Sequence, residues 1–73
     1  MMCFVPLKEL RKGEIFTIAD HMEYGEFIVE QEELLQAKKV FLRTKFGNLL
    51  VSPETEVIVN RDELIYVHGY TKE

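Results

Sequence analysis

Residues 39–59 read KVFLRTKFGNLLVSPETEVIV, and this segment decides the fold that the sequence predicts. Gly47 and Asn48 separate two apolar runs that are rich in the β-branched and aromatic residues favoured in strands. Glycine at the first central position of a loop suits a type II′ turn, whose twist matches that of the flanking strands. The segment therefore predicts a β-hairpin with Gly47-Asn48 as its loop.

This loop also predicts how the two strands of the hairpin pair. Phe46 falls opposite Leu49, and every second residue on either side shares their face. That face is almost entirely apolar and the other is mostly polar, as an antiparallel pair with one buried face requires. We therefore expect Phe46 and Leu42 to be buried, and Arg43 and Lys45 to be exposed. The face expected to be buried contains Val40, Leu42, Thr44, Phe46, Leu49 and Val51, and the opposite face contains Phe41, Arg43, Lys45, Leu50 and Ser52.

Length and composition predict a single domain over residues 1–73. Of the 73 residues, 47% are hydrophobic, which is enough for a folded chain. The single cysteine, Cys3, excludes an internal disulfide and fits a reducing compartment. No apolar run approaches the ~20 residues of a membrane span, and the first residues lack the apolar stretch of a signal peptide. We therefore expect a cytoplasmic protein that does not bind membranes.

The rest of the chain predicts further short strands separated by turns. The last two of these strands are expected to pair with each other through a turn at Arg61-Asp62. The expected elements are strands at 1–5, 14–19, 26–30, 55–60 and 63–70, one helical turn at 6–10, and a loop with at most one helical turn at 31–38.

Five or six short strands joined by tight turns in 73 residues predict a mostly β protein. A small antiparallel SH3-like barrel with at most one or two helical turns is the architecture that needs the least chain. A five-stranded OB-type barrel is the second alternative, because it usually needs a longer chain. A flat sheet packed on a helix at residues 31–38 is the third.

Two segments resemble a known group of proteins. PLKELRKGEIFTI, residues 6–18, resembles the L-x-x-L-x-x-G-[DE]-x-F start of many small uncharacterised β-barrel proteins from bacteria and their phages. FGNLLVSPETEVIV, residues 46–59, is similar to their G-x-L…T-x-V ending. The resemblance covers about a third of the chain and implies a small β fold and a phage or mobile-element origin. It implies no particular activity, because these proteins share none. The matching positions in the second segment are Gly47, Leu49, Thr55 and Val57.

Charge is distributed unevenly along the chain. Residues 13–37 contain seven acidic residues and no Lys or Arg, and residues 38–45 contain four basic residues and no acid. The acidic segment is either a solvated surface or a docking surface for a basic partner. The basic strand alternates cations with an aromatic residue, a pattern found in platforms that bind single-stranded nucleic acid. Lysine on a strand also guards a free edge against aggregation, and the net charge of −4 argues against general nucleic-acid affinity. The nucleic-acid candidates are Lys38, Lys39, Phe41, Arg43 and Lys45.

The last expected pair of strands is apolar on both faces. Val57, Val59, Leu64 and Tyr66 share one face, and Ile58, Ile65 and Val67 share the other, together with Glu56. A chain this short has little left with which to cover two faces, so one face is expected to contact a partner protein or a second copy. The alternative is that Phe4, Val5 and Leu7 fold over this face and close the core. The candidates for partner binding are Ile58, Ile65, Val67 and Tyr70.

The residues that carry chemistry form no recognisable catalytic or metal-binding set. His21, His68 and Cys3 lack the spacing of zinc ligands, and no nucleophile lies beside an evident base. We therefore expect no enzymatic activity and no cofactor. The sequence predicts a small protein-binding module, a phage-type modulator of a host factor, with a nucleic-acid-binding β-barrel as the alternative.

Overall fold

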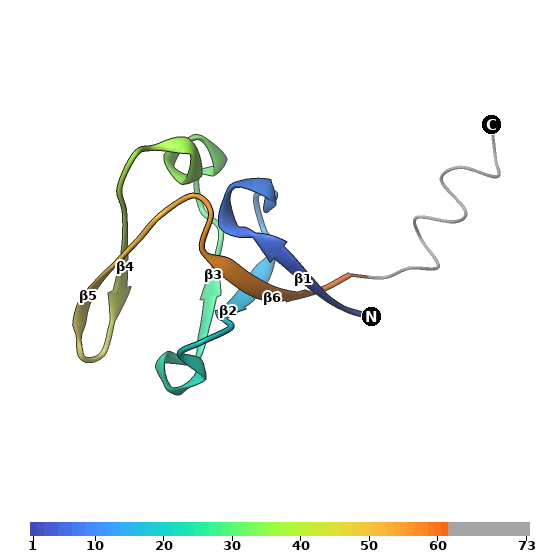
Figure 1. Cartoon of the computed structure of the whole chain (residues 1–73), viewed down its shortest axis with the longest axis horizontal. Helices are drawn as coiled ribbons and strands as arrows, with labels where there is room; N and C mark the ends of the chain where they lie inside the picture. The colour runs from blue at the N-terminus through green and yellow to red at the C-terminus, as the bar shows by residue number, and fades with distance from the viewer. Residues whose placement is uncertain (62–73) are drawn as a thin grey trace, which may run out of the picture.

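In the computed structural model, which describes residues 1–61, the chain forms six β-strands in two antiparallel sheets (Figure 1). The prediction of a mostly β protein is confirmed, and the described residues contain three short 3₁₀ turns but no α-helix. The strands are β1 (Met2–Pro6), β2 (Ile15–Ile18), β3 (Glu26–Ile28), β4 (Val40–Thr44), β5 (Gly47–Val51) and β6 (Glu56–Asn60), and the 3₁₀ turns are η1 (Leu7–Glu9), η2 (Met22–Tyr24) and η3 (Glu32–Gln36).

The larger sheet has the strand order β1-β6-β2-β3, with every neighbouring pair antiparallel. Val57, the second residue of β6, lies opposite Val5 of β1 and Ile18 of β2. The expected hairpin between residues 55–60 and 63–70 is therefore wrong, because both edges of β6 are already paired. Residues 63–70 themselves lie outside the described part of the chain.

Alternation along the four strands gives this sheet an inner and an outer face. On the inner face, Phe16, Ile18, Val57 and Val59 are almost completely buried. Leu7 in η1 and Leu35 in η3 belong to the same core and cover the inner face of the sheet. The nine buried residues of the core are Leu7, Leu10, Phe16, Ile18, Val29, Leu35, Val40, Val57 and Val59.

The β4–β5 hairpin forms the second sheet and packs its inner face against this core. The predicted faces are confirmed for most of the hairpin: Leu42 and Leu49 are half-buried and pack on the core, whereas Arg43 and Lys45 are exposed. The predicted burial of Phe46 is wrong, because 67% of this residue is exposed.

Phe46 is exposed because the hairpin turn differs from the predicted one. Thr44 lies opposite Gly47, so Lys45 and Phe46 form the loop in place of Gly47 and Asn48. The loop moves by two residues and the partner of each residue by four, and an even shift leaves each side chain on its original face. Among the described residues only glycines have positive φ, so the loop is neither type I′ nor type II′.

Side-chain hydrogen bonds select this turn. The Thr44 hydroxyl accepts a hydrogen bond from the Phe46 N–H at 3.0 Å and donates one to the Gly47 carbonyl at 2.7 Å. Gly47 still takes the positive φ that the sequence predicts, at 113°, but it follows the two loop residues. A right-handed turn followed by a glycine with positive φ is a common alternative hairpin connection.

An ion pair fastens the end of β6 to the start of β2. Arg61 Nε donates to Glu14 Oε2 at 2.8 Å, and Arg61 Nη2 donates to Glu14 Oε1 at 3.1 Å. Both side chains are more than four-fifths buried. The hydrogen bonds from Arg61 hold the pKa of the Glu14 carboxyl below its ordinary value, with burial acting against them and the Arg11 N–H adding to them. The pair therefore stabilises the fold while Glu14 is ionised.

The described strands pair into two separate sheets. β3 is hydrogen-bonded to β2 alone and β4 to β5 alone, so the pairing found in residues 1–61 does not close a barrel. β3 rises from η2 to η3 and β4 returns in the opposite direction, with the hairpin standing beside the larger sheet (Figure 1).

Candidate protein-docking surfaces

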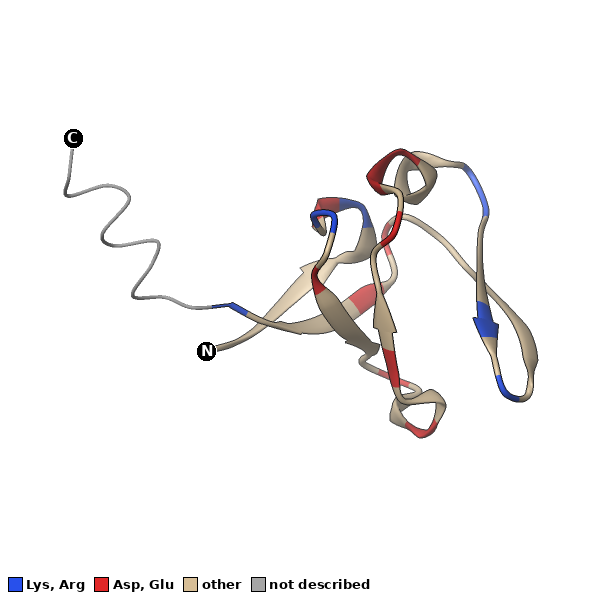
Figure 2. Ribbon diagram, turned by 180° about the vertical axis from the view of Figure 1, so that it is seen from behind, with Lys and Arg blue, Asp and Glu red and all other residues tan. Residues whose placement is uncertain are grey.

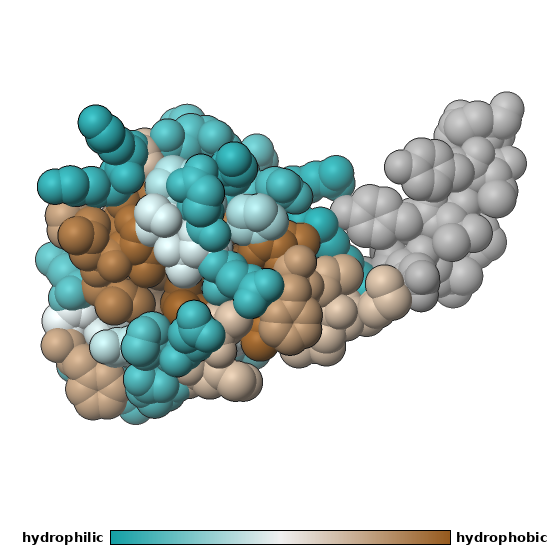
Figure 3. Space-filling view, viewed as in Figure 1, coloured by the Kyte–Doolittle hydropathy of each residue, from teal (hydrophilic) through white to brown (hydrophobic). Residues whose placement is uncertain are grey.

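The outer face of the four-stranded sheet is largely apolar. Met2, Phe4, Ile15 and Ile28 are each more than half exposed, at 62%, 61%, 52% and 55%. Ile58 lies between them in the central strand β6 and is partly exposed. These five residues are called the outer patch below. Hydrophobic surface is visible over β1 and β6 and continues toward the N-terminus (Figure 3).

Strand pairing assembles the outer patch from distant segments. Ile58 lies opposite Phe4 on one side and Thr17 on the other, and Ile15 lies opposite Ile28. The suggestion that the N-terminal segment covers Ile58 is wrong. The segment pairs beside β6, which turns Val5 toward the core and leaves Phe4 exposed next to Ile58.

The outer patch combines one predicted residue with four that sequence reasoning missed. Ile58 was a candidate, whereas Ile65, Val67 and Tyr70 lie outside the described residues. The sequence did not identify the other four residues as binding candidates, because each belongs to a short strand whose neighbours in the sheet are not evident from the sequence. These residues are Met2, Phe4, Ile15 and Ile28. A hollow of about 550 Å³ beside Ile58 is bordered by the polar side chains of Thr17, Glu26 and Asn60.

The predicted basic residues lie along one side of the hairpin. Phe41 and Arg43 share the outer face of β4, where Phe41 is 65% exposed, and Lys38 and Lys39 lie exposed just before this strand. The Lys45 ammonium lies 5.3 Å from the centre of the Phe46 ring. Basic residues lie on and around β4 and acidic residues on β3, η2 and η3, whereas η1 and the loop after it carry both signs (Figure 2).

A groove separates β3 from β4. Its volume is about 400 Å³, and its lining comes from β3, η3 and β4 together with Phe16 of the core. The sequence did not predict this groove, because the groove forms only where β3 and β4, which are consecutive in the chain, do not pair with each other. The alternation of apolar and polar residues within each strand does not indicate whether the two strands pair.

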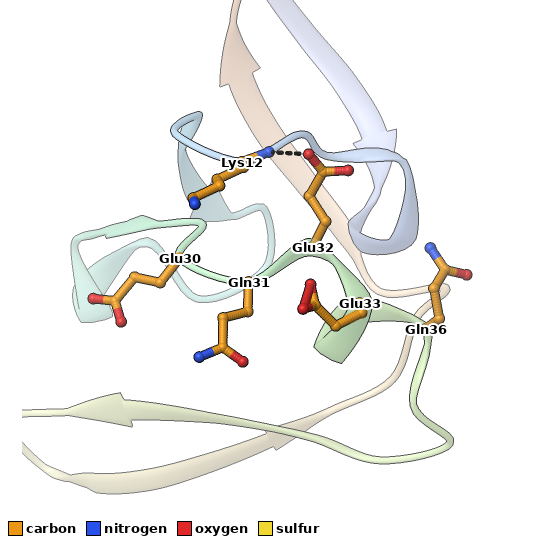
Figure 4. Close-up of a pocket in the computed structure, with 6 residues that line it drawn as sticks. All are labelled: Lys12, Glu30, Gln31, Glu32, Glu33 and Gln36. Carbon is orange, nitrogen blue, oxygen red and sulfur yellow. Dashed lines mark hydrogen bonds between the residues drawn. The ribbon is translucent and has the colours of Figure 1, made fainter.

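The acidic segment supplies a second hollow, of about 430 Å³, between η3 and the loop before β2 (Figure 4). Glu32 turns back and accepts a hydrogen bond from the Lys12 backbone N–H at 2.8 Å. Gln36 donates to the Lys8 carbonyl at 2.8 Å. These two side chains fasten η3 to the N-terminal part of the fold. Part of the acidic segment is therefore structural, since Glu32 here and Glu14 in the ion pair both hold backbone or side-chain partners.

The residues considered for chemistry are dispersed. His21 Nδ1 lies 3.3 Å from Glu23 Oε2 at the surface, Cys3 is half-buried on the inner side of β1, and His68 lies outside the described residues. Within residues 1–61 no group of three or more His, Cys, Asp or Glu side chains could hold a metal ion. The same residues include no helix with the length and apolarity needed to cross a membrane.

The chain matches no family model, no curated protein and no solved structure.

Proposed function

We propose that this protein is a small non-catalytic module that binds another protein through the outer patch. The observation that supports this proposal is the concentration of five apolar side chains on a solvent-facing side of a sheet. Apolar side chains that are exposed singly are ordinary, but a group of them gathered on one face is typical of an interaction site. The patch carries no Lys or Arg, so its chemistry suits an apolar protein surface.

The size of the patch favours a partner that is larger than a second copy. Four strands of three to five residues present at most roughly 19 by 16 Å, or about 300 Å². Two copies packed face to face would bury about 600 Å² in total, and stable interfaces need at least about 1,200 Å². A larger protein can extend the contact past β1, whose outer edge has no strand partner among the described residues.

We also propose that the protein has an SH3-like architecture and acts as a phage-type modulator of a host factor, as the sequence predicts. The two sheets are consistent with an SH3-like arrangement that is open between β3 and β4. The role of phage-type modulator of a host factor, acting in the cytoplasm, is supported by the resemblance of residues 6–18 and 46–59 to small bacterial and phage β-proteins and by the single cysteine.

A photo-crosslinking amino acid at position 4 tests the main proposal in the source cell. Position 22 is the matched control, because Met22 is as exposed as Phe4, at 61%, and lies in η2 away from the patch. We expect a discrete crosslinked product from position 4 and none from position 22. The identified partner should then bind the Phe4→Lys variant at least tenfold more weakly than the Met22→Lys variant.

Two results would contradict the proposal. If position 4 crosslinks only to a second copy and light scattering shows a dimer that Phe4→Lys dissociates, the patch is a self-association surface. If positions 4 and 22 yield the same products, the patch has no specific partner.

Nucleic-acid binding is the second candidate function. It is favoured by the exposed Phe41 beside Arg43, and by the Lys45 cation over the Phe46 ring. A gel shift with single-stranded oligonucleotides at low and moderate salt tests it. A complex that weakens steeply with salt and is lost in the Arg43→Glu variant would support this function, and the absence of a shift at low salt would exclude it.

A further inference from the structure

We propose that the groove between β3 and β4 binds one extended peptide segment of a partner protein, with apolar residues at alternate positions. The segment would add a strand between the two sheets. The groove adjoins the outer patch, because Ile28 belongs to both, but it binds a different kind of ligand, a single strand in place of a folded surface.

The backbone of β3 offers hydrogen bonds to such a strand. Val29 donates its N–H to the Glu14 carbonyl at 2.9 Å and accepts from the Gly13 N–H at 2.8 Å, so its polar groups point toward the β2 side. Because these groups alternate along a strand, those of Ile28 point the opposite way, toward β4. β3 has β2 as its only strand partner among the described residues, so this edge is open.

The opposite side of the groove is a second open edge. β4 pairs with β5 through all five of its residues, and the structure shows no strand on its other side within residues 1–61. An exposed strand edge is a template for β-augmentation, in which a peptide completes the ladder. Two edges that face each other across one groove can bind both sides of the same strand.

The apolar floor of the groove favours a ligand with apolar side chains at the positions that face it. Phe27 and Leu42 project from the inner faces of the two strands, and the buried Phe16, Leu35 and Val40 lie beneath them. The Phe16 and Phe27 rings are stacked with their centres 5.4 Å apart. Alternate residues of an added strand would point toward this floor, so every second residue of the ligand should be apolar.

The charged residues on the two walls of the groove determine which residues suit the remaining positions of the ligand. Glu26 and Glu30 lie on the β3 wall and Arg43 on the β4 wall, so the groove is acidic on one side and basic on the other (Figure 2). Outward-facing residues of the ligand would lie between the two walls. Charge complementarity therefore favours a ligand that carries both signs at these positions, and it disfavours a run of like charges.

The 3₁₀ turns η2 and η3 lie at the two ends of β3. At the hairpin tip, the ring of Tyr24 in η2 meets the Phe46 ring edge to face, with their centres 5.9 Å apart. At the other end, Leu34 of η3 lines the groove and is 55% exposed. Leu34 is therefore an accessible apolar contact for the end of a bound strand.

A designed peptide provides the probe. It is about six residues long, the usual length of a strand, is capped at both ends, and alternates valine with lysine and glutamate. We expect its addition to slow amide hydrogen exchange and shift the amide NMR signals of β3 and β4 in the full chain. The same peptide with N-methylated backbone amides keeps its side chains but cannot complete a ladder, and should bind at least tenfold more weakly.

A matched pair of variants locates the peptide. Leu34→Lys should weaken binding at least fivefold, whereas Met22→Lys should not change it, since both residues are exposed and lie on 3₁₀ turns but only Leu34 lines the groove. The Phe4→Lys variant should also bind normally, which separates this site from the outer patch.

Three outcomes would overturn the inference. The first is equal binding of the methylated and unmethylated peptides, because the site would then not be a strand acceptor. The second is shifts confined to β1 and β6, which would place the peptide on the outer patch. The third is binding that occurs only in the Ile65→Lys variant, which would identify the groove's occupant as the chain's own residues 62–73.

Discussion

Phe16 and Phe46 allow a direct test of the hairpin register, because the same substitution should have very different costs at the two positions. Phe16 is 2% exposed and its ring stacks on Phe27. A buried phenylalanine removes about 200 Å² from water, which corresponds to about 5 kcal/mol at 25 cal/mol per Å². Phe16→Ala should therefore cost about 3–5 kcal/mol, the range measured for such truncations.

Phe46 has only about a third of its surface buried, since 67% is exposed. The same calculation gives at most about 1–2 kcal/mol for Phe46→Ala, including the loss of its contact with the Tyr24 ring. The difference between the two variants should therefore be about 1–4 kcal/mol. In a domain of this size that difference separates the melting temperatures by at least about 4 °C.

Thermal unfolding followed by circular dichroism, with urea titration of both variants, measures this difference. The unsubstituted domain is expected to have about 4–11 kcal/mol of stability, so Phe16→Ala would remove at least about a quarter of it. Equal melting temperatures for the two variants would refute the reasoning. They would mean that Phe46 is buried opposite Leu49 and that Gly47 and Asn48 form the loop.

Three further substitutions test the turn and the ion pair. Thr44→Val removes both hydrogen bonds of the hydroxyl at nearly constant shape and should cost about 1–2 kcal/mol in a urea titration. Gly47→Ala should cost a similar amount, about 1–2 kcal/mol, through backbone strain alone, because an added Cβ has open space around it; tolerance of alanine would contradict the positive φ. The Glu14 pKa is lower in the folded chain, so its contribution to stability is complete above the ordinary glutamate pKa of about 4.3 and is lost as the pH falls through the folded value. Glu14→Gln should therefore lower the free energy of unfolding at pH 7 and flatten its decline in acid, and a pH profile parallel to that of the unsubstituted protein would show that the pair with Arg61 contributes nothing.

Local patterns in the sequence were sufficient to predict most of the strands. The alternation of apolar and polar residues places strands within two residues of β1, β2, β3 and β6, and the even spacing along the hairpin assigns Leu42 and Leu49 to its inner face. The helical turn expected at residues 6–10 corresponds to η1, and the single turn allowed in residues 31–38 corresponds to η3. These features depend on neighbours in the chain, so a single sequence contains the information needed to find them.

Of the candidate site, the sequence identified Ile58 and the basic residues of β4 but not the surroundings that give them a possible role. An exposed Phe4 becomes part of a patch only because β1 lies beside β6, a pairing between the two ends of the described chain. The groove likewise requires that β3 and β4, which are consecutive strands, remain apart.

What the sequence by itself determined is the set of strands and the side of each strand that is apolar. Only the tertiary structure decided which strands are neighbours, because one apolar strand edge resembles another until long-range packing selects its partner. β6 could have paired with the segment after it, but pairing with both β1 and β2 places Val57 and Val59 at the centre of the core. The apolar pattern could not predict which residues form the hairpin loop, because a shift of the pairing by an even number of residues preserves that pattern. The hydrogen bonds of the Thr44 hydroxyl select between the two registers.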